Sequence, residues 1–229
     1  MSCSETAAYV RRRTEGRPAT RQHQCTALGP TVNQTAEPTL IIFLDTEFTD
    51  LVIEPQLLSV GMVSSSGAAS EFYAEVTDRR RIHAASWFAL DVVLPQFGKI
   101  AHASCSYATL GARPGVFIER VVASLDSDRG IEIAFSYDLD WELVERAMRD
   151  GGCAPRGVTM RKLKPRNVYE IVGFGAGKRA AEAYFSAASD APISRHHSLC
   201  DARALRVAYE AVIQPREALE FGALARSDG

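Results

Sequence analysis

The sequence predicts an α/β fold in which a mixed central sheet of about five strands is flanked by α-helices. Two patterns favour this class. Three short apolar segments, separated by turn-forming residues, follow one another between residues 40 and 76, which is typical of an antiparallel meander. From residue 116 onward, segments of helical periodicity alternate with short apolar runs, which is typical of strands connected by helices. A chain of 229 residues is long enough for one such domain.

The individual elements follow from these patterns. The predicted strands are short apolar runs bounded by turn signals, and they cover residues 40–44, 57–63, 71–76, 131–135 and 167–172. The run Leu40–Leu44 is apolar without interruption, which indicates a central strand covered on both faces. The predicted helices have apolar residues at helical spacing or a high alanine content, and they cover residues 116–125, 140–149, 178–188 and 201–213. The last helix is expected to end before Pro215.

The predicted domain occupies residues 39–214 and has a tail at each end. Residues 1–38 carry several arginines among Thr, Gln, Gly and Pro with few periodic apolar positions, which predicts a disordered basic tail. We interpret it as a solvated extension, and a nucleic-acid-binding arm or an organellar targeting peptide are the alternatives. Residues 215–229 are expected to form a C-terminal tail.

Composition excludes several classes of protein. The formal net charge of -2 gives no bulk attraction to nucleic acid, so any polyanion has to be held by local groups. The five cysteines form no CxxC pair, which argues against a disulfide framework and against a zinc site. We expect a cytoplasmic protein with no membrane partner, because no apolar stretch approaches the roughly 20 residues that cross a bilayer. A homodimer is compatible with the sequence.

Two carboxylates follow the first predicted strand. Asp45 and Glu47 are two positions apart, so they share one face if the strand continues through them. Neighbouring carboxylates at the end of a buried strand repel each other strongly unless a cation lies between them. This pair therefore indicates a divalent metal.

Two further carboxylates lie at the predicted starts of helices. Leu205 belongs to the predicted buried stripe of the last helix. Asp201 lies four residues earlier, on the same side of the helix, so it is expected to face inward. The same construction on the middle helix leads to Asp140. Asp138 lies just ahead of that helix, where its side chain is expected to cap free backbone N–H groups. We therefore prefer Asp140 as the inward-facing carboxylate.

The order of these motifs resembles the DEDDh family of 3′-5′ exonucleases. The resemblance covers about residues 39–213, and its motifs are Asp45-Thr46-Glu47, the mid-chain Asp140, and a histidine five residues before Asp201. It implies a ribonuclease H-like fold and two magnesium or manganese ions held by Asp45, Glu47, Asp140 and Asp201. It also implies that His196 is the general base, since His197 is one position out of register. Where family members have an Asn and an aromatic residue before the middle aspartate, this chain has Ser136 and Tyr137.

The resemblance implies a function as well as a fold. It predicts removal of nucleoside 5′-monophosphates from the 3′ ends of single-stranded nucleic acid, with RNA favoured. A DNA-directed proofreading or trimming exonuclease is one alternative, and an inactive nucleic-acid-binding module with the same fold is another. A pocket for the terminal nucleotide is implied beside Thr46, Phe48 and Leu51, although Phe48 fits a place in the core equally well.

Two other motifs carry weaker signals. Residues 156–166 contain a basic cluster that is dense enough to follow a phosphate backbone, but a solvated loop is the commoner explanation; its members are Arg156, Arg161, Lys162, Lys164 and Arg166. The segment Gly173–Lys178 is one residue short of a P-loop, and Arg179 replaces the required Ser or Thr. We expect its glycines to form a turn from a strand into a helix.

Overall fold

The computed structural model describes residues 40–65, 71–123, 130–152, 163–189 and 191–224, with the backbone alone for 214–224. Its strands are β1 (Leu40–Phe48), β2 (Leu57–Ser64), β3 (Glu71–Val76), β4 (Ser104–Cys105), β5 (Ile131–Phe135) and β6 (Leu163–Asn167). Its α-helices are α1 (Arg79–His83), α2 (Tyr107–Ala123), α3 (Asp138–Asp150), α5 (Tyr169–Val172), α6 (Gly175–Ala187) and α7 (Ser198–Leu224). A π-helical turn, η1 (Ala89–Val93), and a 3-10 turn, η2 (Leu94–Gln96), connect β3 to β4. The predicted tail 1–38 lies outside the described residues.

The strands form one six-stranded mixed sheet in the order β4-β3-β2-β1-β5-β6. β1, β2 and β3 pair antiparallel, which confirms the predicted meander. β5 pairs parallel to both β1 and β6, and β3 pairs parallel to β4. The α/β class with a mixed sheet flanked by helices is thus confirmed, and the short strand β4 is an addition to the predicted set.

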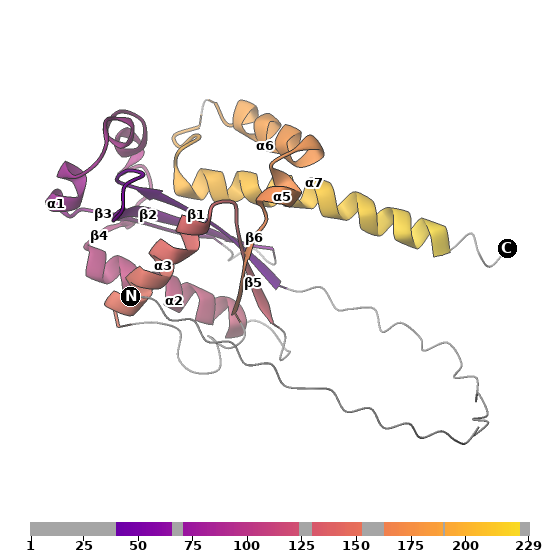
Figure 1. Cartoon of the computed structure of the whole chain (residues 1–229), viewed down its shortest axis with the longest axis horizontal. Coiled ribbons are helices and arrows are strands. Elements are labelled where there is room, and N and C mark those ends of the chain that lie inside the picture. The colour runs from indigo at the N-terminus through magenta and orange to yellow at the C-terminus, as the bar shows by residue number, and fades with distance from the viewer. Residues whose placement is uncertain (1–39, 66–70, 124–129, 153–162, 190, 225–229) are drawn as a thin grey trace, which may run out of the picture. The chain divides into compact units, whose positions relative to one another are not determined.

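Helices cover both faces of the sheet, with α2 and α3 on one side and α5, α6 and α7 on the other (Figure 1). Alternate residues of β1 face the two layers, as expected for a central strand. Leu40, Ile42 and Leu44 join the core beneath α2 and α3. Phe43 points to the opposite layer, where its ring meets that of Tyr209 in α7 edge to face at 5.5 Å between centroids. The odd-numbered positions of β1 therefore face α7.

The buried stripe of α3 orients its first turn. Leu143, Val144, Ala147 and Met148 are buried against the sheet and α2. Full burial of side chains such as Leu and Met contributes about 1.5–3 kcal/mol each. Because these residues repeat at helical spacing, they fix the rotation of α3 and turn Asp140, three residues before Leu143, inward.

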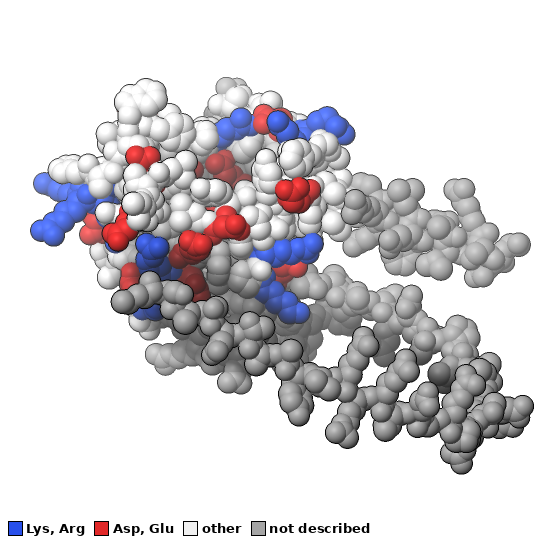
Figure 2. All heavy atoms as spheres, viewed as in Figure 1, with Lys and Arg blue, Asp and Glu red and all other residues white. Residues whose placement is uncertain are grey.

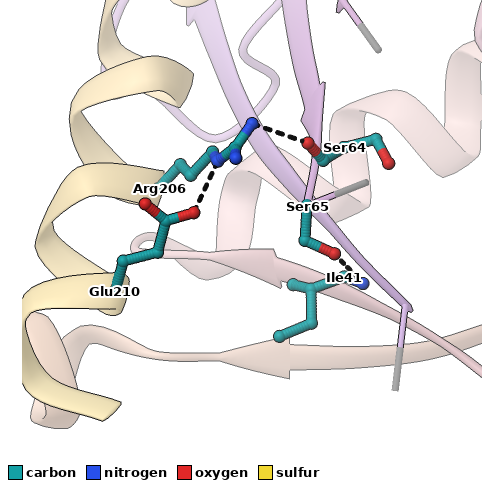
Figure 3. A network of polar contacts seen from close by, with 5 residues as sticks. All are labelled: Ile41, Ser64, Ser65, Arg206 and Glu210. Atoms are coloured by element: carbon teal, nitrogen blue, oxygen red, sulfur yellow. Dashed lines mark hydrogen bonds and ion pairs between the residues drawn. The ribbon is translucent and has the colours of Figure 1, made fainter. Parts of the chain in front are cut away.

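Helix α7 is attached to the sheet near the end of β2. Arg206 donates to the backbone oxygen of Ser64 at 3.0 Å and to Glu210 Oε1 at 2.7 Å (Figure 3). Ser65 Oγ accepts a hydrogen bond from the Ile41 amide at 3.1 Å in the same region. These bonds join α7 to β2 and β2 to the start of β1, so the helix runs along the sheet in a fixed direction.

One predicted element, the strand at residues 167–172, was wrong. The predicted strand 167–172 is instead the end of β6 followed by the short helix α5. Val168 and Val172 lie one helical turn apart, both buried, and the Val172 amide donates to the Val168 oxygen at 3.0 Å. The actual strand includes Pro165, which an edge strand tolerates because its free N–H side needs no partner.

The remaining helix boundaries differ from the predictions in extent. α2 begins at Tyr107, before the predicted 116, since Gly111 and Pro114 interrupt its apolar pattern but not its backbone. α3 begins at Asp138 rather than at Asp140, and α6 at Gly175 rather than at residue 178. α7 begins at Ser198 and continues past Pro215, because a proline removes one helical N–H but does not always end a helix. Among the residues that the structure describes, no helix has the length and apolar character needed to cross a membrane.

Candidate metal centre

The end of β1 supplies the first two carboxylates. Asp45 and Glu47 lie within the strand, opposite Gly61 and Ser59 of β2, on the face that points to α7. Glu47 is buried, with 9% of its surface exposed. The predicted sharing of one face by Asp45 and Glu47 follows directly from the strand alternation.

The third carboxylate comes from the first turn of α3. Asp140 is buried, and its Oδ1 accepts hydrogen bonds from the Thr46 amide at 3.2 Å and from the Thr46 hydroxyl at 2.7 Å. Its other oxygen, Oδ2, is buried and has no hydrogen-bond partner among the described residues. Thr46 stands between Asp45 and Glu47, so these bonds join α3 to the two strand carboxylates.

Asp138 faces away from this group. Its side chain is exposed and accepts a hydrogen bond from Asn167 Nδ2 at 2.8 Å. The predicted capping role of Asp138 is wrong, since Tyr137 occupies the N-cap position and makes no side-chain cap bond. The preference for Asp140 as the inward-facing residue agrees with the geometry, although its role in binding stays a prediction.

The entry into α7 supplies the fourth carboxylate and a histidine. The His196 amide donates to Asp201 Oδ2 at 3.0 Å, while Asp201 Oδ1 is buried without a hydrogen-bond partner among the described residues. His196 has a positive φ of 65°, an uncommon conformation for a residue with a side chain. Its ring lies against Phe88 edge to face, at 5.0 Å between centroids.

The adjacent His197 points elsewhere. Its ring stacks on Tyr73 of β3 at 4.3 Å between centroids, and only 2% of its surface is exposed. Burial lowers the pKa of His197 to about 4, so the ring is neutral at pH 7. Of the two histidines, His196 is the one whose ring reaches the carboxylates.

Close packing between β2 and α7 positions this entry. Gly61 lies opposite Asp45, and a Cβ atom at Gly61 would overlap the backbone of Ser198 and Leu199. The hydroxyls of Ser59 and Ser198 are hydrogen-bonded at 3.0 Å in the same buried region. The absence of a side chain at Gly61 therefore allows the first turn of α7 to lie directly on the sheet.

Burial and mutual repulsion raise the pKa values of the four carboxyl groups. Burial, followed by the charges of Asp140, Asp201 and Glu47, raises the pKa of Asp45 well above its ordinary value. Burial and the charges of Asp201 and Asp140 do the same to the pKa of Glu47. The pKa of Asp140 and that of Asp201 each rise to about 7, chiefly through burial, against the hydrogen bonds from Thr46 and His196. Four carboxyl groups in this setting cannot all ionise without a counter-charge.

The donor set fits a divalent cation. Glu47, His196 and Asp201 offer ligand atoms that all lie within 4.8 Å of one another. The unpartnered Oδ2 of Asp140 and Oδ1 of Asp201 are further oxygen donors that no described protein group satisfies. Carboxylate oxygens suit hard cations, and a bound cation would restore the ionised state of these groups.

His196 is suited to accept a proton. Burial, followed by the nearby charge of Arg195, lowers the pKa of His196 below its ordinary value of 6.5. The imidazole is therefore neutral at pH 7, and one ring nitrogen has a free lone pair.

The three residues predicted to approach a nucleotide lie in different environments. Thr46 is buried and bonded to Asp140, so its hydroxyl supports the carboxylates. Phe48 is half-buried, packs against the core and stacks on Tyr137 at 6.4 Å. Leu51 is 71% exposed in the loop after β1. Contact of these residues with a nucleotide stays a prediction.

The predicted basic cluster is only partly within the described residues. Lys164 and Arg166 lie exposed on β6, where Arg166 forms an ion pair with Glu132 at 3.2 Å. Arg156, Arg161 and Lys162 lie outside the described residues.

Sequence reasoning missed two contacts of this site: the support that Thr46, predicted only to approach a nucleotide, gives to Asp140, and the close approach at Gly61. Neither has a local signal, since both depend on contacts across more than 90 residues of chain. No family model matches the chain, and a search of curated proteins gives no match.

Proposed function

We propose that this protein is a divalent-metal-dependent 3′-5′ exonuclease with a ribonuclease H-like fold, acting on single-stranded nucleic acid with RNA favoured. The observation that carries the proposal is the convergence of Asp45, Glu47, Asp140 and Asp201 from three remote segments. Two of their oxygens are buried and have no hydrogen-bond partner within the described part of the chain. If the four carboxylates had only a structural role, no positive charge would offset their mutual repulsion.

The chemistry assigned to the site is hydrolysis of a phosphodiester. Asp45, Glu47, Asp140 and Asp201 would hold two magnesium or manganese ions, which would supply positive charge for the phosphate and for the leaving 3′-oxygen. His196, neutral at pH 7, accepts the proton of the attacking water. The new bond joins the water oxygen to phosphorus, and the bond to the 3′-oxygen breaks, which releases a nucleoside 5′-monophosphate.

The chain holds these groups in place by direct contacts. Thr46 orients the carboxylate of Asp140 through two hydrogen bonds. Asp201 accepts a hydrogen bond from the backbone N–H of His196, so the position of the proposed base is coupled to that of a proposed metal ligand. Such preorganisation is what the proposed reaction requires, since misplacement of a base or ligand lowers the rate steeply.

Matched RNA and DNA oligomers labelled at the 5′ end test the proposal. With magnesium or manganese we expect stepwise shortening from the 3′ end, faster on RNA, and no shortening with chelator. Asp45→Ala and Asp201→Ala should eliminate turnover. Shortening of DNA alone would assign a DNA-directed exonuclease, and binding of either oligomer without any metal-dependent product would assign an inactive binding module.

A further inference from the structure

A cavity of about 400 Å³ opens on the candidate metal centre, and its lining includes Asp45, His196 and Asp201. The lining also includes Tyr169 of α5 and Lys178 of α6. The volume lies in the range of pockets that hold small ligands. One cavity thus brings together the acidic candidate centre, an aromatic ring and a cation.

Apolar residues form another part of the lining. They are Val172 of α5 and Ala204, Leu205 and Ala208 of α7, and all four are buried. Such an apolar surface suits contact with a sugar or base, while the polar lining groups suit contact with phosphates.

Lys178 supplies a positive charge to the lining. It is exposed in the first turn of α6 and forms no ion pair with any residue that the structure describes. Arg195, which also lines the cavity, is already paired with Glu182 at 2.6 Å and lies over the ring of Phe185 at 4.3 Å. Figure 2 shows basic side chains over α6, on a face that also carries several acidic side chains. Lys178 is therefore the lining cation that is free to meet an anion among the described residues.

Tyr169 supplies an aromatic ring to the same lining. The residue is 47% exposed, and its ring meets that of Phe174 edge to face at 5.5 Å between centroids. Aromatic rings stack with nucleic-acid bases independently of sequence. The aromatic ring, the apolar lining and the charge together provide surfaces for a base, a sugar and a phosphate.

We infer that this cavity binds the nucleotide next to the scissile phosphodiester of a single strand, with Lys178 contacting a phosphate and Tyr169 the base or sugar. The inference rests on the proposed function and adds a substrate subsite to it. This subsite lies on the α5–α6–α7 side of the metal centre, apart from Phe48 and Leu51 in and after β1.

Steady-state hydrolysis by Lys178→Gln and Arg179→Gln tests the subsite. Arg179 is the matched control, because it is the next residue of α6 and is exposed without lining the cavity. We expect Lys178→Gln to raise KM for a single-stranded RNA oligomer about tenfold with kcat nearly unchanged, the scale of one lost charged contact. Arg179→Gln should keep the wild-type KM. Tyr169→Leu should also raise KM, and Tyr169→Phe should restore it.

A binding measurement separates this inference from the proposed function. Binding of a labelled oligomer is measured by fluorescence anisotropy at several salt concentrations, with every protein carrying Asp140→Asn. Adding Lys178→Gln should reduce the steepness of the plot of log binding constant against log salt concentration by ~0.7, the single-strand value for one phosphate contact. Bis(p-nitrophenyl) phosphate, which carries no nucleotide, should be hydrolysed at the same rate by the wild type and by Arg179→Gln. Equal KM values and salt slopes for the two variants would overturn the subsite. A wild type that hydrolyses neither substrate would overturn the proposed function alone.

Discussion

Replacing Thr46 with valine removes one hydroxyl from the support of Asp140 and keeps a side chain of nearly the same size. The hydroxyl donates to Asp140 Oδ1 at 2.7 Å, while the longer bond from the Thr46 amide, at 3.2 Å, remains in the variant. Both groups are buried, so water cannot replace the lost donor freely. A hydrogen bond to a charged group contributes about 1.5–3 kcal/mol.

The direction of the effect follows from the ionised form of Asp140. The Thr46 hydroxyl stabilises the carboxylate, so its loss raises a pKa that burial already holds at about 7. Since a change of one unit in pKa corresponds to about 1.36 kcal/mol, loss of this hydrogen bond should raise the pKa of Asp140 by about one to two units. A cation requires the ionised ligand, so the pH midpoint of manganese binding should move upward by the same amount. At pH 7, where about half of Asp140 is ionised in the wild type, the affinity should fall by about 5- to 50-fold.

Manganese titrations of the wild type and Thr46→Val between pH 6 and 9, followed by calorimetry or thermal shift, measure both quantities. Thr46→Ser is the control, because it keeps the hydroxyl and should retain a midpoint near that of the wild type. An unchanged midpoint and affinity in Thr46→Val would refute the claim that this contact supports a metal ligand.

Three other predictions concern the placement and roles of site residues. Gly61→Ala puts a methyl group against the first turn of α7, so we expect destabilisation of about 1–3 kcal/mol by chemical denaturation and slower hydrolysis; wild-type values for both would contradict the packing argument. His196→Ala should lower kcat by about 100-fold or more without unfolding the protein. A comparable loss from His197→Ala, with no loss from His196→Ala, would show that His197 is the base and would contradict the assignment to His196. Asp140→Asn should eliminate turnover, whereas Asp138→Asn, on an exposed side chain, should leave it close to wild type; the opposite ranking would exchange their roles.

Local periodicity was enough to predict the central elements and the orientation of their carboxylates. The alternation of β1 gave the common face of Asp45 and Glu47, and the buried stripe of α3 gave the inward direction of Asp140. These features repeat within a few residues, so they are visible in the sequence. The arrangement of the first three strands followed in the same way, since short turns favour antiparallel neighbours.

Features that depend on distant contacts could not be predicted in this way. β6 was not predicted, because Pro165 and its exposed neighbours do not form an apolar strand pattern. Such a sequence is acceptable in a strand only at the edge of the sheet, where β6 lies. Asp138 was expected to cap α3, but Asn167 at the end of β6 binds it instead. The cavity beside the metal centre needs α5, α6 and α7 together, and no single segment of the chain indicates it.

Anomalous diffraction from a crystal grown with manganese tests the central claim most directly. The account predicts anomalous density between the carboxylates of Asp45, Glu47, Asp140 and Asp201, with His196 beside it. Manganese-saturated crystals in which these carboxylates surround no anomalous density, or point apart into solvent, would contradict it.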